Sequence, residues 1–388
     1  MVERIRMNDG TKNLTQDLTQ NSIQNSAQNS ALCKTLDETA HSATRRLTPS
    51  EAVELLRSSD LAQLGLAAQA VSARLHPEKF RTYNIDRNIN YTNVCECRCK
   101  FCGFSCDIDD PKAYVISIDE MFRKIEETLE LGGRQILLQG GLHPELRLVW
   151  FENMFLEIKK KFPQINIHGL TPTEIWYLAR MEGISFEEVI CRLKLAGLGS
   201  LPGGGAEILV DEVRKSVSPK KIMTDDWLHI MRLWHQAGGR STATMMFGHV
   251  ETLEQRVEHL DRIRQLQDET AGFTAFIPWT YQRFHDLPLP KTGAFEYLKN
   301  LAVARIFLDN IPNIQTSWVT QGLAIGQLAL RFGANDMGSV MIEENVVASC
   351  GTVFRANENE LRNAIEKSGF QPKKRNVFYE LEDAAELL

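Results

Sequence analysis

Four of the eight cysteines in the chain lie close together, at Cys95, Cys97, Cys99 and Cys102. Three of them, Cys95, Cys99 and Cys102, have the spacing C-x3-C-x2-C, so one tight loop can bring three thiolates onto one inorganic cluster. A [4Fe-4S] cluster held by three cysteines keeps one iron free to bind a small molecule. The spacing therefore predicts a reactive iron–sulfur cluster, with the ring of Phe101 beside whatever the free iron binds.

A cysteine-rich loop can also hold zinc, which needs four ligands and usually takes them from two pairs of cysteines. Cys97 or Cys106 could supply a fourth sulfur, but no second pair occurs elsewhere in the sequence. Disulfides are disfavoured because these cysteines are too close together to pair, and because the chain opens without an apolar secretory stretch. An iron–sulfur electron carrier is a further non-enzymatic alternative, and it would use four cysteine ligands.

The cysteine loop needs a fold that places it at the end of a strand. Apolar runs of strand length recur eight times, and helical patterns lie between them. This α/β alternation predicts a (β/α)8 barrel of the TIM type, in which the chemistry is located where the strands end. We expect the strands at residues 88–94, 135–139, 165–170, 199–201, 241–247, 273–277, 315–319 and 339–342.

Two segments differ from the barrel pattern. Residues 1–47 contain an Asn/Ser/Gln repeat and few apolar side chains, so we expect a disordered low-complexity tail. The folded part, residues 48–388, opens with Thr48, Pro49 and Glu51 in the order of a capping box, which predicts a helical N-terminal lead-in to about residue 75. A last helix at residues 358–367 and the segment after it are expected to cap the barrel.

Bulk composition limits the partners and the compartment. The chain has 44 Lys and Arg against 50 Asp and Glu, and the resulting formal charge of −6 argues against a nucleic-acid partner. No apolar run approaches the roughly 20 residues that span a bilayer, so we expect no membrane partner. Free thiols and a labile cluster together predict a reducing, cytoplasmic location.

The cysteine spacing after a first strand, with an aromatic residue before the last cysteine, resembles the signature of radical S-adenosylmethionine (SAM) enzymes. Longer phrases resemble the radical SAM enzymes of the futalosine pathway of menaquinone biosynthesis, from about Thr48 to Phe354. Two of them, FIPW and TSWVTQG, favour the branch that cyclises dehypoxanthine futalosine. The others are SLPGGGAEI, TATMMFGHVET, ALRFGANDMGS and MIEENVV.

The resemblance implies a [4Fe-4S] cluster on Cys95, Cys99 and Cys102, and SAM as the second cofactor. It implies that one electron cleaves SAM to methionine and a 5′-deoxyadenosyl radical, which takes a hydrogen atom from ribose C4′ of the substrate. The sugar radical then adds to the benzoate ring, closes a spiro ring, and loses an electron and a proton. Cys97 departs from the resembled pattern, where a polar residue is expected, and could compete as a ligand.

The resemblance also implies the partners of the protein. They are a nucleoside-like small-molecule substrate and an electron donor such as flavodoxin or ferredoxin. Aminofutalosine synthesis, a different reaction on the same scaffold, remains an alternative activity.

Candidate cofactor-binding residues lie at the predicted strand ends. Gly140 and Gly141 follow the second strand and resemble the glycine-rich strand end that binds the SAM amino group, although the usual acid after the glycines is absent here. His168 lies near the end of the third strand, and three glycines precede Glu207, which is placed to hold ribose hydroxyls. The glycines could instead form a plain turn, and Glu207 could be a first-turn helix acid favoured by the helix dipole.

His249 and Glu251 follow the fifth strand and are our candidates for the base that takes the final proton. A lone histidine at such a position is more often a packed core residue. Thr320, Gln321 and Asn335 are candidate donors to the substrate carboxylate, because the sequence offers no obvious basic patch for it.

Overall fold

The computed structural model describes residues 34–39, 42, 44–284, 287–352 and 354–382. Within these residues, parallel strands occupy eight positions around a closed barrel, so the predicted (β/α)8 architecture is confirmed. Single bridges join Leu201 to Ser241 and Gln315 to Asp336, and pairing of the first with the last strand closes the ring. The strands are β1 (Phe80–Asn84) and β2 (Asp86–Ile89), which share the first position, then β3 (Gln135–Leu138), β4 (Asn166–Gly169), β5 (Leu198–Ser200), β6 (Ser241–Phe247), β7 (Phe273–Thr280), β8 (Asn313–Ile314) and β9 (Asp336–Ser339).

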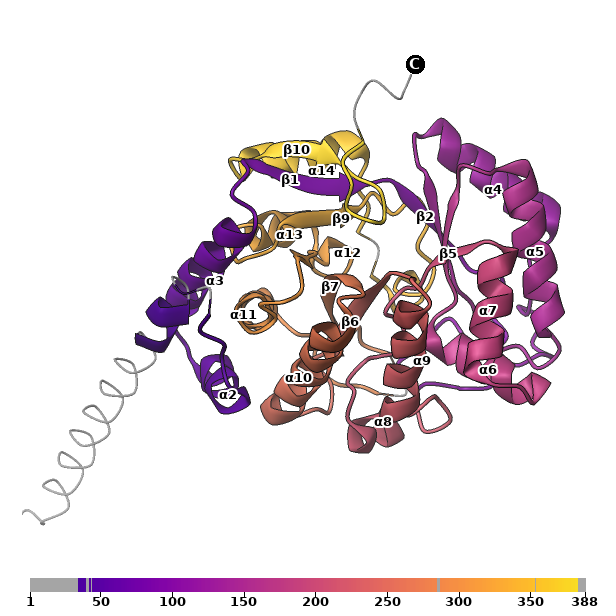
Figure 1. The fold of residues 1–388 in the computed structure, drawn as a ribbon, viewed down its shortest axis with the longest axis horizontal. Coiled ribbons are helices and arrows are strands. Elements are labelled where there is room, and N and C mark those ends of the chain that lie inside the picture. Colours follow the sequence, from indigo (N-terminus) through magenta and orange to yellow (C-terminus); the bar gives the residue numbers. More distant parts are fainter. Residues whose placement is uncertain (1–33, 40–41, 43, 285–286, 353, 383–388) are drawn as a thin grey trace, which may run out of the picture.

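Helices surround the strands and bury their apolar faces against them (Figure 1). Local signals define the ends of these helices: Ser117 caps one by accepting from the Glu120 N–H, and Gly197 ends another with a φ of 114°. The helices are α2 (Pro49–Arg57), α3 (Leu61–Leu75), α4 (Ile118–Glu130), α5 (Leu148–Lys161), α6 (Pro172–Glu182), α7 (Phe186–Ala196), α8 (Asp211–Val217), α9 (Thr224–Gln236), α10 (Leu253–Thr270), α11 (Ala294–Phe307), α12 (Trp318–Gln321), α13 (Leu323–Ala329) and α14 (Glu358–Lys367), with a 3-10 turn at Ala348–Cys350.

The helical lead-in begins where the sequence predicts it. Thr48 caps α2, and the side chains of Thr48 and Glu51 each accept from the other's backbone N–H, as a capping box requires. The predicted tail lies outside the described residues as far as residue 33. Its described part departs from the expectation, because residues 34–39 are helical and both Leu36 and Leu47 are buried in the core.

Some strand boundaries differ from the predicted ones. The first strand lies earlier than predicted, because the chain beyond Ile89 leaves the sheet: Thr92 pairs with Val115 and Val94 pairs with Cys106 instead. The predicted strand at residues 315–319 is also displaced, since Trp318–Gln321 forms α12. In both places, apolar residues are buried by a loop or a short helix rather than by strand pairing, and periodicity alone does not separate these cases.

A further strand, β10 (Gln371–Lys374), follows α14 and pairs in parallel with β1, on the side away from β9 (Figure 1). The chain then turns inward, and Arg375 binds Asp336 at the start of β9. The C-terminal segment therefore covers the end of the barrel at which the strands begin.

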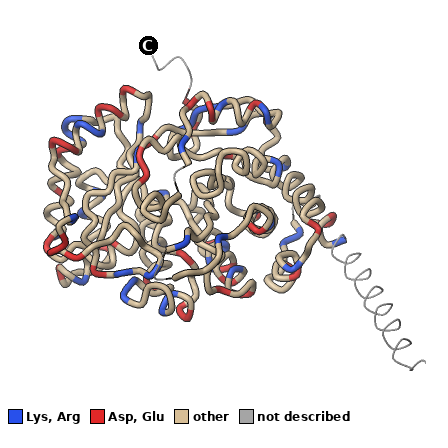
Figure 2. The backbone as a smooth tube through the Cα atoms, turned by 180° about the vertical axis from the view of Figure 1, so that it is seen from behind, with Lys and Arg blue, Asp and Glu red and all other residues tan. Residues whose placement is uncertain are grey.

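Lysines and arginines alternate with acidic residues along the outer helices (Figure 2). Many form ion pairs between neighbouring helices, as Arg192 does with Glu152 at 2.6 Å, and such exposed pairs contribute little to stability individually. None of the described helices combines the length and apolarity that a bilayer crossing requires.

His235 is a buried polar residue near the end of α9. Its titration should change the free energy of unfolding with pH. Its Nδ1 lies 2.8 Å from Thr270 Oγ1 and its Nε2 lies 2.7 Å from Ser241 Oγ. Burial lowers the pKa of His235 to about 4, from an ordinary value of 6.5. Between these two pH values the unfolded chain binds a proton that the folded chain does not, so stability falls as the pH drops from about 6.5 to about 4.

We expect His235→Gln to reduce the dependence of unfolding free energy on pH by about one proton in this window. Denaturant unfolding of the wild type and the variant between pH 4 and pH 7 measures it. His229→Gln, at an exposed position of the same helix, is the matched control and should keep the wild-type slope. An unchanged slope in the His235 variant would contradict the prediction.

Candidate active site

A cavity of about 390 Å³ fills the inside of the barrel. It reaches from the cysteine loop, where the strands end, to Arg375 and Tyr379 of the C-terminal segment, where the strands begin. Alternate residues of β1 and β2 line it, because successive side chains of a strand point to opposite faces. These inward side chains and the one that follows β2 are all polar: Asn84, Asp86, Asn88 and Asn90.

Cys95, Cys97, Cys99 and Cys102 all line this cavity at the strand-end rim. The loop that carries them is fixed by its backbone, since the Cys95 N–H donates to the Cys106 carbonyl at 3.1 Å and the Cys102 N–H donates to the Cys99 carbonyl at 3.0 Å. Cys106 itself is buried beside the loop. Several soft thiol donors on one wall of a cavity fit an iron–sulfur cluster.

The cysteine thiols have different proton affinities. Hydrogen bonding from Cys97 lowers the pKa of Cys95 to about 6 and also lowers the pKa of Cys99, with the charge of Lys221 acting in the same direction. The pKa of Cys97 rises in return, since its proton serves those two sulfurs, and burial raises the pKa of Cys102. In the structure the Cys97 thiol donates to the Lys220 carbonyl at 3.5 Å.

Lys221 is a cavity residue that the sequence did not single out. Its ammonium forms an ion pair with Glu207 and lies 5.6 Å from the centre of the Phe101 ring. Burial alone would raise the pKa of Glu207, but Lys221 and then Arg214 outweigh burial and lower it. The ion pair of Glu207 and Lys221 and the ring of Phe101 thus lie together beside the cysteines, and all three residues line the cavity.

The glycine pair after β3 lines the cavity as predicted, and the structure adds the acid that the sequence lacked there. Any Cβ at Gly141 would come within 2.0 Å of the Val94 carbonyl oxygen, so only glycine fits. Glu174, at the start of α6, accepts from the Gly140 N–H at 3.1 Å and from the Tyr91 hydroxyl at 2.8 Å. The only signal in the sequence for Glu174 was its capping-box spacing from Thr171, which reads as structural.

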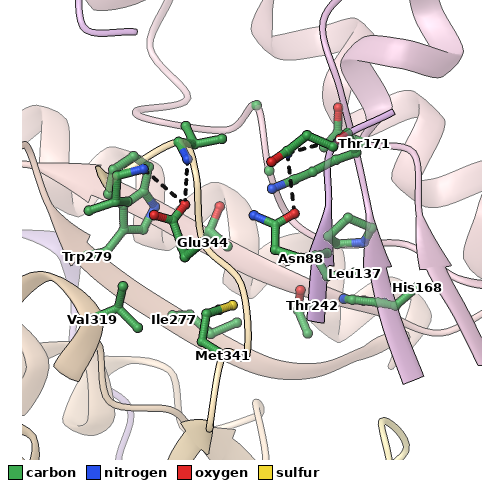
Figure 3. Close-up of a pocket in the computed structure, with 18 of the residues that line it drawn as sticks. Asn88, Leu137, His168, Thr171, Thr242, Ile277, Trp279, Val319, Met341 and Glu344 are labelled. Atoms are coloured by element: carbon green, nitrogen blue, oxygen red, sulfur yellow. Dashed lines mark hydrogen bonds between the residues drawn. The ribbon is translucent and has the colours of Figure 1, made fainter. Parts of the chain in front are cut away.

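His168 points into the cavity from β4, near Asn88 and Thr242 (Figure 3). Its Nδ1 lies 2.7 Å from Ser200 Oγ, which orients the ring. Burial, helped by Arg375, lowers the pKa of His168 to about 3, so the imidazole is neutral near pH 7. The opposite wall is mainly apolar and includes Ile277, Val319, Met341 and Trp279 (Figure 3).

His249 and Glu251 do not reach the cavity, which corrects their prediction as a catalytic base. Their side chains are fully buried next to each other, with His249 Nδ1 3.2 Å from Glu251 Oε2. Glu251 accepts from the Gly248 N–H at 2.7 Å and from Arg256 Nε at 2.7 Å. The pair therefore fixes the turn between β6 and α10, because Glu251 accepts from the backbone N–H groups of Gly248 and His249.

The predicted carboxylate donors are also used internally. Gln321 donates to Thr280 Oγ1 at 2.7 Å, and Asn335 donates to Asn313 Oδ1 at 2.7 Å. Thr320 does line the cavity, but its hydroxyl is 2.8 Å from Ser317 Oγ. These side chains link neighbouring strands and helices at the barrel wall.

Comparison with known proteins decides the family. The radical SAM superfamily model matches residues 89–263, and the model of the CofH/MqnC C-terminal region matches residues 270–388. The chain belongs to the radical SAM superfamily. The cyclic dehypoxanthine futalosine synthase of Streptomyces coelicolor is 47% identical to it over 350 residues, which are 89% of this chain and 87% of that protein. The cyclic dehypoxanthine futalosine synthase of Halalkalibacterium halodurans is 43% identical over 339 residues, which are 87% of this chain and 91% of that protein.

Among solved structures, methylornithine synthase shares the fold, with a TM-score of 0.68 at 17% identity over 87% of this chain and 97% of that one. The chain described here is therefore a radical SAM enzyme that acts on a small-molecule substrate. Its cofactors are a [4Fe-4S] cluster and SAM. The presence of a [4Fe-4S] cluster, predicted from the cysteine spacing, is therefore confirmed, and the zinc and electron-carrier alternatives are not supported.

Cys97 and Cys99 both line the cavity, and substituting each one shows whether it is a ligand of the cluster. We expect Cys97→Ser to retain the reconstituted cluster, because the C-x3-C-x2-C spacing does not include Cys97. Cys99→Ser should lose it. Iron and sulfide content, together with the electron paramagnetic resonance spectrum of the reduced protein, measure both outcomes, and equal iron loss in the two variants would make Cys97 a ligand.

Proposed function

We propose that this radical SAM enzyme converts dehypoxanthine futalosine to cyclic dehypoxanthine futalosine in menaquinone biosynthesis. The observation that carries the proposal is the identity of 47% and 43% to two proteins of that name, over nearly nine tenths of the chain. The cavity agrees with it, since a wall of amide and hydroxyl side chains suits a sugar and the apolar wall suits an aromatic ring (Figure 3).

The cofactor sites follow from the residues at the strand-end rim. Cys95, Cys99 and Cys102 would hold the cluster, and Phe101 would pack beside it. The cluster and SAM, when bound, supply one-electron chemistry that removes a hydrogen atom from the ribose C4′ of the substrate.

Different residues would bind the two parts of SAM, methionine and adenosine. The backbone of Gly140 and Gly141, with the Glu174 carboxylate beside them, would bind the amino group of the methionine part. Glu207, held by Lys221, would bind the ribose hydroxyls of the adenosine part. Lys221 and Arg214 lower the pKa of Glu207, which keeps it a carboxylate, and a carboxylate binds a diol well.

The inner part of the cavity would hold the substrate. His168 is fixed through Nδ1 by Ser200 and would offer its Nε2 to a hydroxyl group of the substrate. Because the imidazole is neutral, Nε2 can accept a hydrogen bond from that hydroxyl. Ile277, Val319 and Met341 would exclude water from the substrate radical on the opposite side (Figure 3).

The remaining partners are proposals of the same kind. Reduction of the cluster requires a low-potential electron donor, and flavodoxin or ferredoxin is the proposed one. Seven of the eight cysteines lie among the described residues and all seven are free thiols, which suits a reducing cytoplasm.

An anaerobic turnover assay tests the proposed function. The reconstituted enzyme is mixed with dithionite, SAM and dehypoxanthine futalosine, and the products are followed by mass spectrometry. We expect stoichiometric 5′-deoxyadenosine and a product lighter than the substrate by two hydrogens. 5′-Deoxyadenosine without that product would reject this substrate and direct the assay to aminofutalosine synthesis.

A further inference from the structure

The barrel end opposite the cysteine loop is built by the C-terminal segment. Since all strands run parallel, Asp336 at the start of β9 marks the end away from the cluster. Arg375 binds Asp336 there through two hydrogen bonds, of 2.6 Å and 2.8 Å, and Thr82 donates to the same carboxylate at 2.5 Å. This floor of the cavity is therefore made of side chains that are far apart in the sequence.

Tyr379 reaches into this floor from a tight turn. Its ring lies 3.9 Å from the Arg375 guanidinium carbon, and it lines the cavity. The turn is closed by the Asn376 N–H, which donates to the Glu380 carbonyl at 2.9 Å. Tyr379 has a φ of 66°, a left-handed conformation that an aromatic residue rarely adopts, and such strain is concentrated at binding sites.

The hydroxyl of Tyr379 has no partner inside the protein. Its Oη is buried and makes no hydrogen bond among the described residues. Burial raises the pKa of Tyr379, so the hydroxyl keeps its proton and remains a donor. A second unpartnered atom, Gln135 Oε1 at the start of β3, lines the same cavity, which marks this end for a polar ligand.

The charges of the cavity indicate which polar ligand it is. Lys221 and Arg375 are the basic side chains that line the cavity in the described part of the chain. Lys221 belongs to the cysteine end, where it is paired with Glu207. Arg375, at the opposite end, is paired with Asp336, so the group that this end offers to an anion is the hydrogen-bond donor of Tyr379.

Asp86 is an acidic residue at the floor, and it does not repel an anionic ligand there. Asp86 accepts from Ser339, from Gln135 at 2.9 Å and from Asn84 at 3.3 Å, so its oxygens are already hydrogen-bonded. Burial also raises the pKa of Asp86, which favours its neutral form.

We propose that Tyr379 and Arg375 form a specificity subsite that binds the carboxylate of the substrate's benzoate group. The Tyr379 hydroxyl donates to a carboxylate oxygen, and the Arg375 guanidinium, whose charge is balanced by Asp336, packs on the ring and holds it in place. The subsite fixes the end of the substrate farthest from the cluster. This inference rests on the proposed function, since it takes dehypoxanthine futalosine as the substrate.

Tyr379→Phe tests the subsite, because it removes the hydroxyl and keeps the ring. In the reconstituted enzyme we expect KM for dehypoxanthine futalosine to rise about tenfold, as for a lost hydrogen bond to a charged group, and KM for SAM to stay unchanged. The melting temperature of the ligand-free protein should not fall, because the lost hydroxyl has no partner in the free protein. A structural role would instead lower the melting temperature and leave KM unchanged.

Tyr83→Phe is the matched control. Its hydroxyl donates to Glu358 at 2.7 Å and accepts from Arg362 at 3.0 Å, away from the cavity lining. We expect this variant to lower the melting temperature and to keep both KM values. Tyr379→Phe should therefore change the KM for the substrate and not the melting temperature, whereas Tyr83→Phe should change the melting temperature and not KM.

The methyl ester of the substrate identifies the group that is bound. The wild type should prefer the acid to the ester, and Tyr379→Phe should lose most of this preference. Equal KM values for the wild type and Tyr379→Phe, an equal loss for acid and ester, or a changed KM for SAM would each overturn the subsite. A wild-type enzyme that forms no cyclised product would instead overturn the proposed function itself.

Discussion

The buried ion pair between Arg375 and Asp336 joins parts of the barrel that are distant in sequence. Asp336 opens β9, Thr82 of β1 donates to it, and Arg375 arrives from the C-terminal segment. Removing one partner of such a pair leaves an uncompensated buried charge, which typically costs about 3–5 kcal/mol. The closure of β1 on β9, the floor of the cavity and the position of Tyr379 all depend on this interaction.

Each end of the cavity has one basic side chain, and an acidic side chain balances it. At the cysteine end, the charge of Lys221 lowers the pKa of Cys95 and Cys99, and Glu207 balances that charge. At the floor, Asp336 already balances Arg375, so a donor such as the Tyr379 hydroxyl is offered without a large net charge. Between them lie the neutral His168 and the amide side chains of β2. In the proposed subsite, this distribution would serve an anionic substrate in a chain of net charge −6.

Prediction from sequence was most reliable where the signal is local. The capping box of Thr48 and Glu51 needs only neighbouring residues, and it is present in the structure. Strand ends were less reliable: Thr92 and Val94 pair with a loop, although their apolar pattern is that of a strand. His249 and Glu251 show the same limit for function, because a polar pair after a strand can serve the turn it belongs to rather than the cavity.

The sequence by itself determined the cluster motif, the alternation of strands and helices, and the family, because each of these depends on spacing along the chain. It also placed Phe101, Gly140, Gly141, His168 and Glu207 at the rim or wall of one cavity, since parallel strands bring their ends together. Only the tertiary structure decided that Glu174 supplies the acid beside the glycines, that Lys221 faces the cysteines, and that Arg375 and Tyr379 form the floor. The physical reason is that these contacts join residues with no fixed separation in sequence, and packing alone determines which of them meet.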